Sequence, residues 1–163
     1  MKALNEIAQV GLTVPDLEAA IKWYAEVFGY KLFMPPMHAV AGEGPLGVID
    51  ADVFRSKIKA SKKAILADGN GTGLELMEFE NPTTKDFAPE YSPWKPGYNH
   101  FAVVNPNVDN LLERVVANGG KKVSKKWAPF PGVPFELAMV EDPWGNCIEV
   151  LSLSADEMAL PHK

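Results

Sequence analysis

Two pairs of polar residues stand at matching places in a sequence repeat, and their side chains could bind a metal ion. Gln9 and His100 lie in short apolar segments, and Glu75 and Glu149 each lie between two apolar residues of a later segment. A carboxylate in an apolar setting is costly unless it is paired or bound to a metal, and a second carboxylate nearby adds repulsion. A divalent cation would relieve both costs, with the imidazole nitrogen and the amide oxygen completing four protein ligands. The sequence therefore predicts a metal site formed by Gln9, Glu75, His100 and Glu149.

The repeat consists of two aligned pairs of segments. Residues 9–32, "QVGLTVPDLEAAIKWYAEVFGYKL", align without a gap with residues 100–123, "HFAVVNPNVDNLLERVVANGGKKV". Residues 68–79, "DGNGTGLELMEF", align with residues 142–153, "DPWGNCIEVLSL". The first alignment makes Gln9 equivalent to His100, and the second makes the two glutamates equivalent.

Each longer segment predicts a strand followed by an amphipathic helix, because its apolar residues recur with the spacing i, i+3, i+4, i+7. Asp16 and Asn107 are suitable N-caps, while Gly29 and the pair at 119–120 suit helix C-termini. With the closing segments, each copy predicts a strand, a helix and two or three further strands. The expected fold is α+β, with two tandem βαβββ modules whose mixed sheets form a concave cup with the helices outside.

The predicted modules occupy residues 1–80 and 98–163 and together form one structural domain. The first copy is the longer one, and we assign its extra length to an insertion at about 33–66, which is rich in glycine and proline. Residues 81–97 form the predicted linker between the modules, with four prolines.

Strand side chains alternate between the two faces of a sheet, so the pattern also predicts where the candidate ligands point. Val10 and Leu12 suit the face beneath the helix, which leaves Gln9 on the other face. The apolar neighbours of Glu75 and Glu149 likewise suit the helix-packed face. We therefore expect all four candidate ligands to face the inner surface.

Each candidate also has an ordinary structural interpretation when it is taken alone. A glutamate in a strand such as "LELMEFE" is commonly exposed to solvent, as we expect for Glu78 and Glu80. A single histidine more often forms a structural hydrogen bond than a metal bond. The occurrence of ligand-capable residues at both equivalent pairs of the repeat favours the metal site.

Composition excludes several other classes of function. The net charge of −5 argues against binding to the phosphates of nucleic acid. The sequence contains no run of about 18 apolar residues, the length needed to cross a membrane. The start of the chain is too short and polar for a secretory signal, and the single cysteine, Cys147, excludes an intrachain disulfide and a cysteine-rich zinc site. We expect a cytoplasmic protein with a small-molecule substrate and with neither a nucleic-acid nor a membrane partner.

The chain resembles the vicinal oxygen chelate superfamily, which includes glyoxalase I, fosfomycin-resistance enzymes, methylmalonyl-CoA epimerase, extradiol dioxygenases and bleomycin-binding proteins. The resemblance rests on the doubled strand–helix unit, on "NHFAVV" (99–104) and on "EDPWGNCIEVLS" (141–152), and it covers nearly the whole chain. It places the family's metal ligands on Gln9, Glu75, His100 and Glu149, a set similar to that of the zinc-type glyoxalase I. It also implies a homodimer.

The resemblance implies a metal-dependent lyase or isomerase of the lactoylglutathione lyase type, acting on a small carbonyl-bearing metabolite. One divalent ion per site, which the ligand types allow to be zinc, nickel, iron or manganese, would chelate two neighbouring substrate oxygens and stabilise an enediolate. A carboxylate beside the metal would transfer the proton, with Glu149 as our first choice and Glu75 as the second. The participation of glutathione stays open, because Arg55 and Arg114 are the only arginines to pair with its carboxylates.

Two other activities of the superfamily are alternatives. An Fe(II)-dependent dioxygenase would use the same site, although dioxygenases of the superfamily use two histidines and one glutamate, and Gln9 replaces the first of those histidines. A metal-free binding protein, as in the antibiotic-sequestering branch, tends to lack the inward ligand set that this chain has.

Aromatic residues around the predicted site could line a substrate pocket. Tyr98 shares a predicted strand face with His100, and "WAPFPGVPF" (127–135) resembles a flexible loop over the site. The candidate pocket residues are Tyr98, Trp94, Phe130, Phe135 and His38. Trp94, Phe130 and Phe135 suit plain core packing equally well, and His38, in the insertion, suits a surface position equally well.

Overall fold

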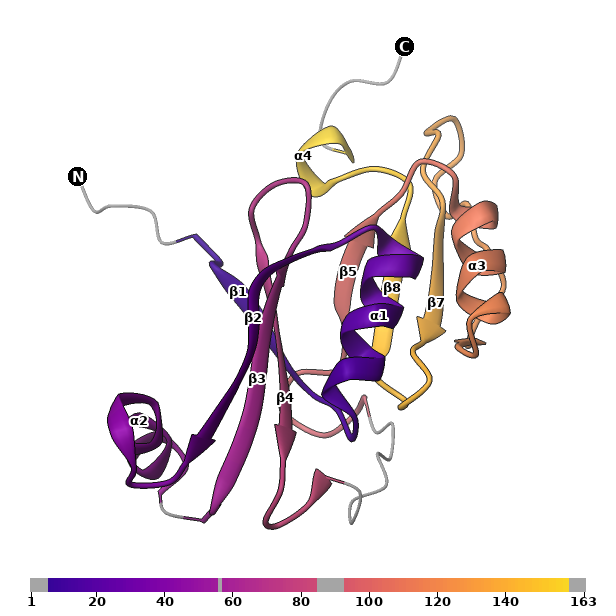
Figure 1. Cartoon of the computed structure of the whole chain (residues 1–163). Coiled ribbons are helices and arrows are strands. Elements are labelled where there is room, and N and C mark those ends of the chain that lie inside the picture. Colours follow the sequence, from indigo (N-terminus) through magenta and orange to yellow (C-terminus); the bar gives the residue numbers. More distant parts are fainter. Residues whose placement is uncertain (1–5, 56, 85–92, 159–163) are drawn as a thin grey trace, which may run out of the picture. The chain divides into compact units, whose positions relative to one another are not determined.

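The computed structural model describes residues 6–55, 57–84 and 93–158. The chain divides into two compact units, Met1–Ala88 and Pro89–Lys163, and each unit contains one four-stranded mixed sheet with a helix against it (Figure 1). The prediction of an α+β fold with two modules is confirmed. Part of the predicted linker, residues 85–92, lies outside the described residues.

The two units have the same strand order. The elements of the first unit are β1 (Gln9–Thr13), α1 (Leu17–Phe28), β2 (Lys31–Val40), α2 (Gly44–Val53), β3 (Ala60–Ala67) and β4 (Gly73–Phe79), in the sheet order β1-β4-β3-β2. Those of the second are β5 (Phe101–Val104), α3 (Val108–Ala117), β6 (Lys121–Lys122), β7 (Leu137–Glu141), β8 (Cys147–Leu151) and α4 (Ala155–Met158), in the order β5-β8-β7-β6. In each sheet the first strand pairs in parallel with the last, and the other pairs are antiparallel.

The core of each unit lies between its sheet and its first helix. In the first unit the buried residues of α1 lie against β3 and β4, whose contribution to the core is Ala64, Leu66, Leu74 and Leu76. In the second unit the corresponding residues on the sheet are Val103, Ala138, Val140, Ile148 and Val150. The predicted alternation of strand faces is therefore observed in both sheets.

The predicted helix caps are also confirmed. The Asp16 carboxylate accepts the backbone N–H of Ala19 at 3.0 Å, and Asn107 accepts that of Asn110 at 3.1 Å. Gly29 ends α1 with φ of +75°, a conformation that glycine adopts without the steric cost of a Cβ atom.

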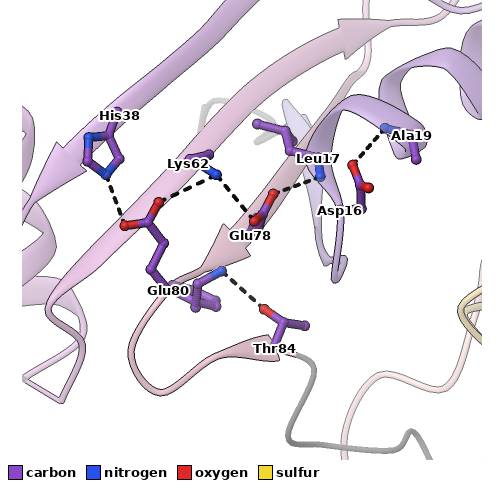
Figure 2. Close-up of polar contacts among 9 residues, drawn as sticks. Asp16, Leu17, Ala19, His38, Lys62, Glu78, Glu80 and Thr84 are labelled. Carbon is purple, nitrogen blue, oxygen red and sulfur yellow. Dashed lines mark hydrogen bonds and ion pairs between the residues drawn. The ribbon is translucent and has the colours of Figure 1, made fainter.

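One expectation, that Glu78 is exposed to solvent, is wrong. Its side chain is only 19% exposed, and its Oε2 accepts the backbone N–H of Leu17 at 2.9 Å, at the first turn of α1 (Figure 2). Lys62 lies 3.4 Å from both Glu78 and Glu80. A carboxylate at a helix N-terminus pairs with a free N–H group and complements the helix dipole. Glu78 therefore fastens the start of α1 to the sheet.

We expect Glu78→Ala to lower the free energy of unfolding by about 1–2 kcal/mol, the usual cost of leaving such an N–H group without its acceptor. Urea denaturation followed by circular dichroism measures this loss. Glu80→Ala is the matched control, because the Glu80 carboxylate belongs to the same cluster but contacts Lys62 and His38 instead of an N–H group of α1. Its effect is expected to be smaller. Equal losses in the two variants would contradict the capping role.

The segment predicted as an insertion contains most of β2, all of α2 and most of β3. Strand β2 includes Pro35 and Pro36, which have no N–H group to donate to a neighbouring strand. They are tolerated because β2 is an edge strand and because its pairing with β3 is irregular between Leu32 and Met37. Helix α2, which the sequence did not predict, lies at one end of β2 and β3 (Figure 1).

In the part of the chain that the structure describes, none of the helices combines the length and the apolar character needed to span a membrane.

Candidate functional site

The first sheet brings Gln9 and Glu75 together. They lie on the neighbouring strands β1 and β4, and Gln9 Nε2 donates a hydrogen bond to Glu75 Oε2 at 2.8 Å. The residue opposite Gln9 is Gly73, where a Cβ atom would lie 3.0 Å from that of Gln9. The absence of a side chain at this position lets the Gln9 side chain cross to β4.

The second sheet brings His100 and Glu149 together in the equivalent place. His100 immediately precedes β5, Glu149 lies on β8, and their Nε2 and Oε2 atoms are 3.4 Å apart. Both side chains are partly exposed, at 35% and 24%. Each module thus places one glutamate beside one nitrogen-bearing side chain, that of Gln9 in the first unit and that of His100 in the second.

Two matching turns hold the strands that carry the glutamates. Asp68, before β4, accepts the backbone N–H groups of Asn70 and Thr72. Asp142, before β8, accepts those of Trp144 and Asn146. In both turns the glycine three residues after the aspartate has a positive φ, +85° and +90°. In each copy the aspartate and the glycine therefore build the turn that starts the glutamate's strand.

The four predicted ligands are divided equally between the two units. Within the described residues no group of three or more His, Cys, Asp or Glu side chains lies together as a metal-binding cluster. What the structure shows is one pair in each unit, made of the residue types that the repeat predicts.

The face of the first sheet that carries Gln9 and Glu75, here called the inner face, also carries helix α2. The Asp50 carboxylate of α2 is buried, accepts a hydrogen bond from Ser61 Oγ at 2.6 Å and forms an ion pair with Lys63. Ser61 and Lys63 share a face of β3 with Ile65, the register partner of Glu75. The sequence did not predict this cluster.

The structure does not bring His38 to the Gln9–Glu75 pair. His38 lies on β2 opposite Lys62, on the face that also carries Glu78, and its Nε2 is 3.2 Å from Glu80 Oε2 (Figure 2). Helix α1 packs against this face of the sheet, which is opposite to the face of the Gln9–Glu75 pair. We therefore leave His38 out of the candidate site.

The aromatic candidates of the second unit are in different environments. Trp94, Tyr98 and Phe130 are exposed, whereas Phe135 is only 4% exposed and its ring stacks on that of Phe130 with centroids 5.7 Å apart. Tyr98 lies outside β5, which begins at Phe101. The expectation that Tyr98 shares a strand face with His100 is wrong, because regular pairing with β8 starts only at Phe101.

The sequence of the chain matches a family model over most of its length. Residues 6–150 match the Glyoxalase/Bleomycin resistance protein/Dioxygenase superfamily. The chain belongs to this superfamily. The doubled module is thus that of a superfamily member.

Among relatives within the superfamily, the chain is 28% identical over 152 residues to a 2-epi-5-epi-valiolone epimerase from an Actinomyces species, covering 91% of this chain and 80% of the relative. It is 25% identical over 158 residues to a lactoylglutathione lyase of Salmonella typhimurium, covering 93% and 92%. It is 29% identical to a lactoylglutathione lyase of Arabidopsis thaliana, of which it spans only 41%.

Solved structures show the same fold. A glyoxalase family protein from Bacillus cereus superposes with a TM-score of 0.74 at 20% identity, covering 92% of this chain and 95% of that protein. The glyoxalase I of Leishmania major superposes with a TM-score of 0.60 at 20% identity, covering 91% and 86%.

Proposed function

We propose that this protein is a metal-dependent lyase or isomerase that moves a proton beside the carbonyl group of a small metabolite. The observation that supports this most directly is the repeated pairing: Gln9 with Glu75 in one module, and His100 with Glu149 in the other. Relatives named as lactoylglutathione lyases and as an epimerase are consistent with this proposal.

The four residues fit a divalent cation by their chemistry. Two carboxylates supply the charge that the cation needs, and an imidazole and an amide oxygen are common additional ligands. Gln9 Nε2 already donates to Glu75, so Oε1 is the Gln9 atom suited to a cation. When bound, the cation would supply electrostatic stabilisation for negative charge that develops on two neighbouring substrate oxygens.

Glu149 is the proposed base. As a carboxylate it removes the proton from the carbon next to the carbonyl, and as the resulting carboxylic acid it returns that proton to a carbon of the same substrate. Where the first carbon bears a hydroxyl group, return of the proton to the former carbonyl carbon gives isomerisation, with the hydroxyl proton passing to the former carbonyl oxygen. Return to the opposite face of the same carbon gives epimerisation. Its partial exposure leaves Glu149 accessible to a substrate. Glu75 is the second candidate for this base.

We also propose that the protein works as a homodimer.

The test combines metal analysis with proton exchange. Protein purified without chelator and without a nickel column is expected to contain close to one divalent ion per predicted site. In D₂O it should catalyse the incorporation of deuterium at the carbon beside the carbonyl group. The probes are hydroxyacetone and the hemithioacetal that phenylglyoxal forms with a thiol, and NMR measures the exchange. Protein that neither contains nor takes up metal would overturn the proposal. Oxygen consumption with Fe(II) and a catechol would favour a dioxygenase instead.

A further inference from the structure

Apolar side chains form a strip on the inner face of the first sheet, beside the Gln9–Glu75 pair. The strand register aligns Met34 with Ile65 and Ile65 with Glu75 in one row, and it aligns Met37, Lys63 and Met77 in the next. The apolar members are each neither fully buried nor fully exposed. They are Met34, Met37, Ile65 and Met77.

Two glycines show how closely this strip approaches the candidate ligands. A Cβ atom at Gly73 would lie 3.0 Å from Gln9 Cβ and 3.3 Å from Ile65 Cγ2. A Cβ atom at Gly11 would lie 3.3 Å from the methyl carbon of Met77. The Ile65 and Met77 side chains therefore lie close to the two glycines that are the register partners of Gln9 and Glu75.

Helix α2 closes the strip at the end away from Gln9. The Phe54 ring, which directly follows α2, meets the Phe79 ring edge to face with centroids 5.2 Å apart. Phe79 is four residues beyond Glu75 on β4, a distance of about 13 Å along an extended strand. The two rings occupy the last part of this distance, and Met77 lies between them and Glu75 on the same face of β4.

The charge on the strip is already neutralised. The Lys63 amine, which lies in the row of Met77, forms its ion pair with the buried carboxylate of Asp50. An anionic group on a ligand would have to compete with that carboxylate for the amine. A long ligand with two carboxylates, such as a glutathione conjugate, is therefore poorly matched to this face.

We propose that helix α2, held by Asp50, determines specificity by limiting the ligand group beside the Gln9–Glu75 pair to a compact, uncharged substituent the size of one ring. The proposal rests on the proposed function for the identity of the neighbouring site. Methionine side chains suit such a ligand, because the thioether is polarisable and adapts its shape to ring edges. Phe54 is the residue whose removal should lengthen the strip.

The experiment uses hydroxamates of increasing length on metal-loaded protein: acetohydroxamate, benzohydroxamate and 4-phenylbenzohydroxamate. Calorimetry measures Kd, corrected for each ligand's affinity for the free ion, and NMR of ¹³C-methyl-labelled methionines locates the ring. We expect benzohydroxamate to bind about tenfold tighter than acetohydroxamate, in line with burial of one ring. In the natural protein, 4-phenylbenzohydroxamate should lack this tenfold advantage over acetohydroxamate. In Phe54→Ala it should regain the advantage.

Phe33→Ala is the matched control, because Phe33 is an exposed phenylalanine on the edge strand β2 of the same unit. It should leave all three affinities unchanged. A phenyl extension that binds as tightly as benzohydroxamate in the natural protein, or no gain in Phe54→Ala, would overturn the proposal. Ring-induced shifts confined to Met139, on the second sheet, would overturn it as well.

The same labelled protein separates this proposal from the proposed function. If acetohydroxamate does not bind, the metal site is wrong, and the strip is tested without metal by benzyl alcohol and 4-phenylbenzyl alcohol. The first should shift the Met37 and Met77 methyl signals, and the second should do so only in Phe54→Ala. No shift from either alcohol would overturn the role of α2 independently of the metal.

Discussion

Glu149→Gln is expected to abolish most proton transfer, lowering the rate of deuterium exchange by about 10²–10⁴-fold, the usual contribution of a positioned acid–base group. An amide of the same shape cannot accept the proton, and it also removes one of the two negative charges offered to the cation. Metal content measured on the same preparation should fall as well. The exchange rate is measured by NMR in D₂O, and the metal by elemental analysis.

Two further substitutions make this result interpretable. Glu80→Gln is the control for the loss of a strand carboxylate, because Glu80 lies on the α1 side of the sheet, where it contacts Lys62 and His38. It should keep both metal and exchange. Glu75→Gln should lose metal but, after reloading with excess metal, regain more exchange than Glu149→Gln does. The reverse order would make Glu75 the base, and full activity in both variants would contradict the site.

The sequence predicted the candidate pairs because each rests on local patterns that survive folding. Alternation along β4 and β8 requires Glu75 and Glu149 to face away from their apolar neighbours, which are buried under the helices. The side-chain caps at Asp16 and Asn107 depend on residues only three positions away. Gapless alignment of the two copies then makes Gln9 and His100 equivalent without any knowledge of tertiary contacts.

Helix α2 could not be predicted in this way because it lacks an apolar face. Its buried positions are Gly47 and Asp50, while Leu46, Val48, Ile49 and Val53 are exposed. Position 47 accepts only glycine, because a Cβ atom there would lie 1.8 Å from the carbonyl oxygen of Val40. The helix is held through Asp50 to two residues of β3. A polar tertiary contact of this kind leaves no periodic signal in the sequence.

Lys63→Met is expected to lower the free energy of unfolding by about 3 kcal/mol, the second large effect. Asp50 is only 1% exposed and Lys63 only 15% exposed, so the substitution leaves a buried carboxylate with the Ser61 hydroxyl but without its countercharge. Removing one partner of a buried ion pair commonly costs several kcal/mol for this reason. Urea denaturation measures the loss, and Lys62→Met, at the adjacent and more exposed lysine, should cost much less.

The double variant Asp50→Leu with Lys63→Met decides what the ion pair does. Replacing both charges with apolar groups removes the desolvation cost together with the attraction, so the double variant should be more stable than Lys63→Met alone. If α2 needs the ion pair for its position, hydrogen exchange of residues 44–53 will remain faster than in the natural protein even when global stability recovers. Recovery of slow exchange would show instead that apolar contact alone can hold α2 on the inner face, and that the charges serve another purpose there.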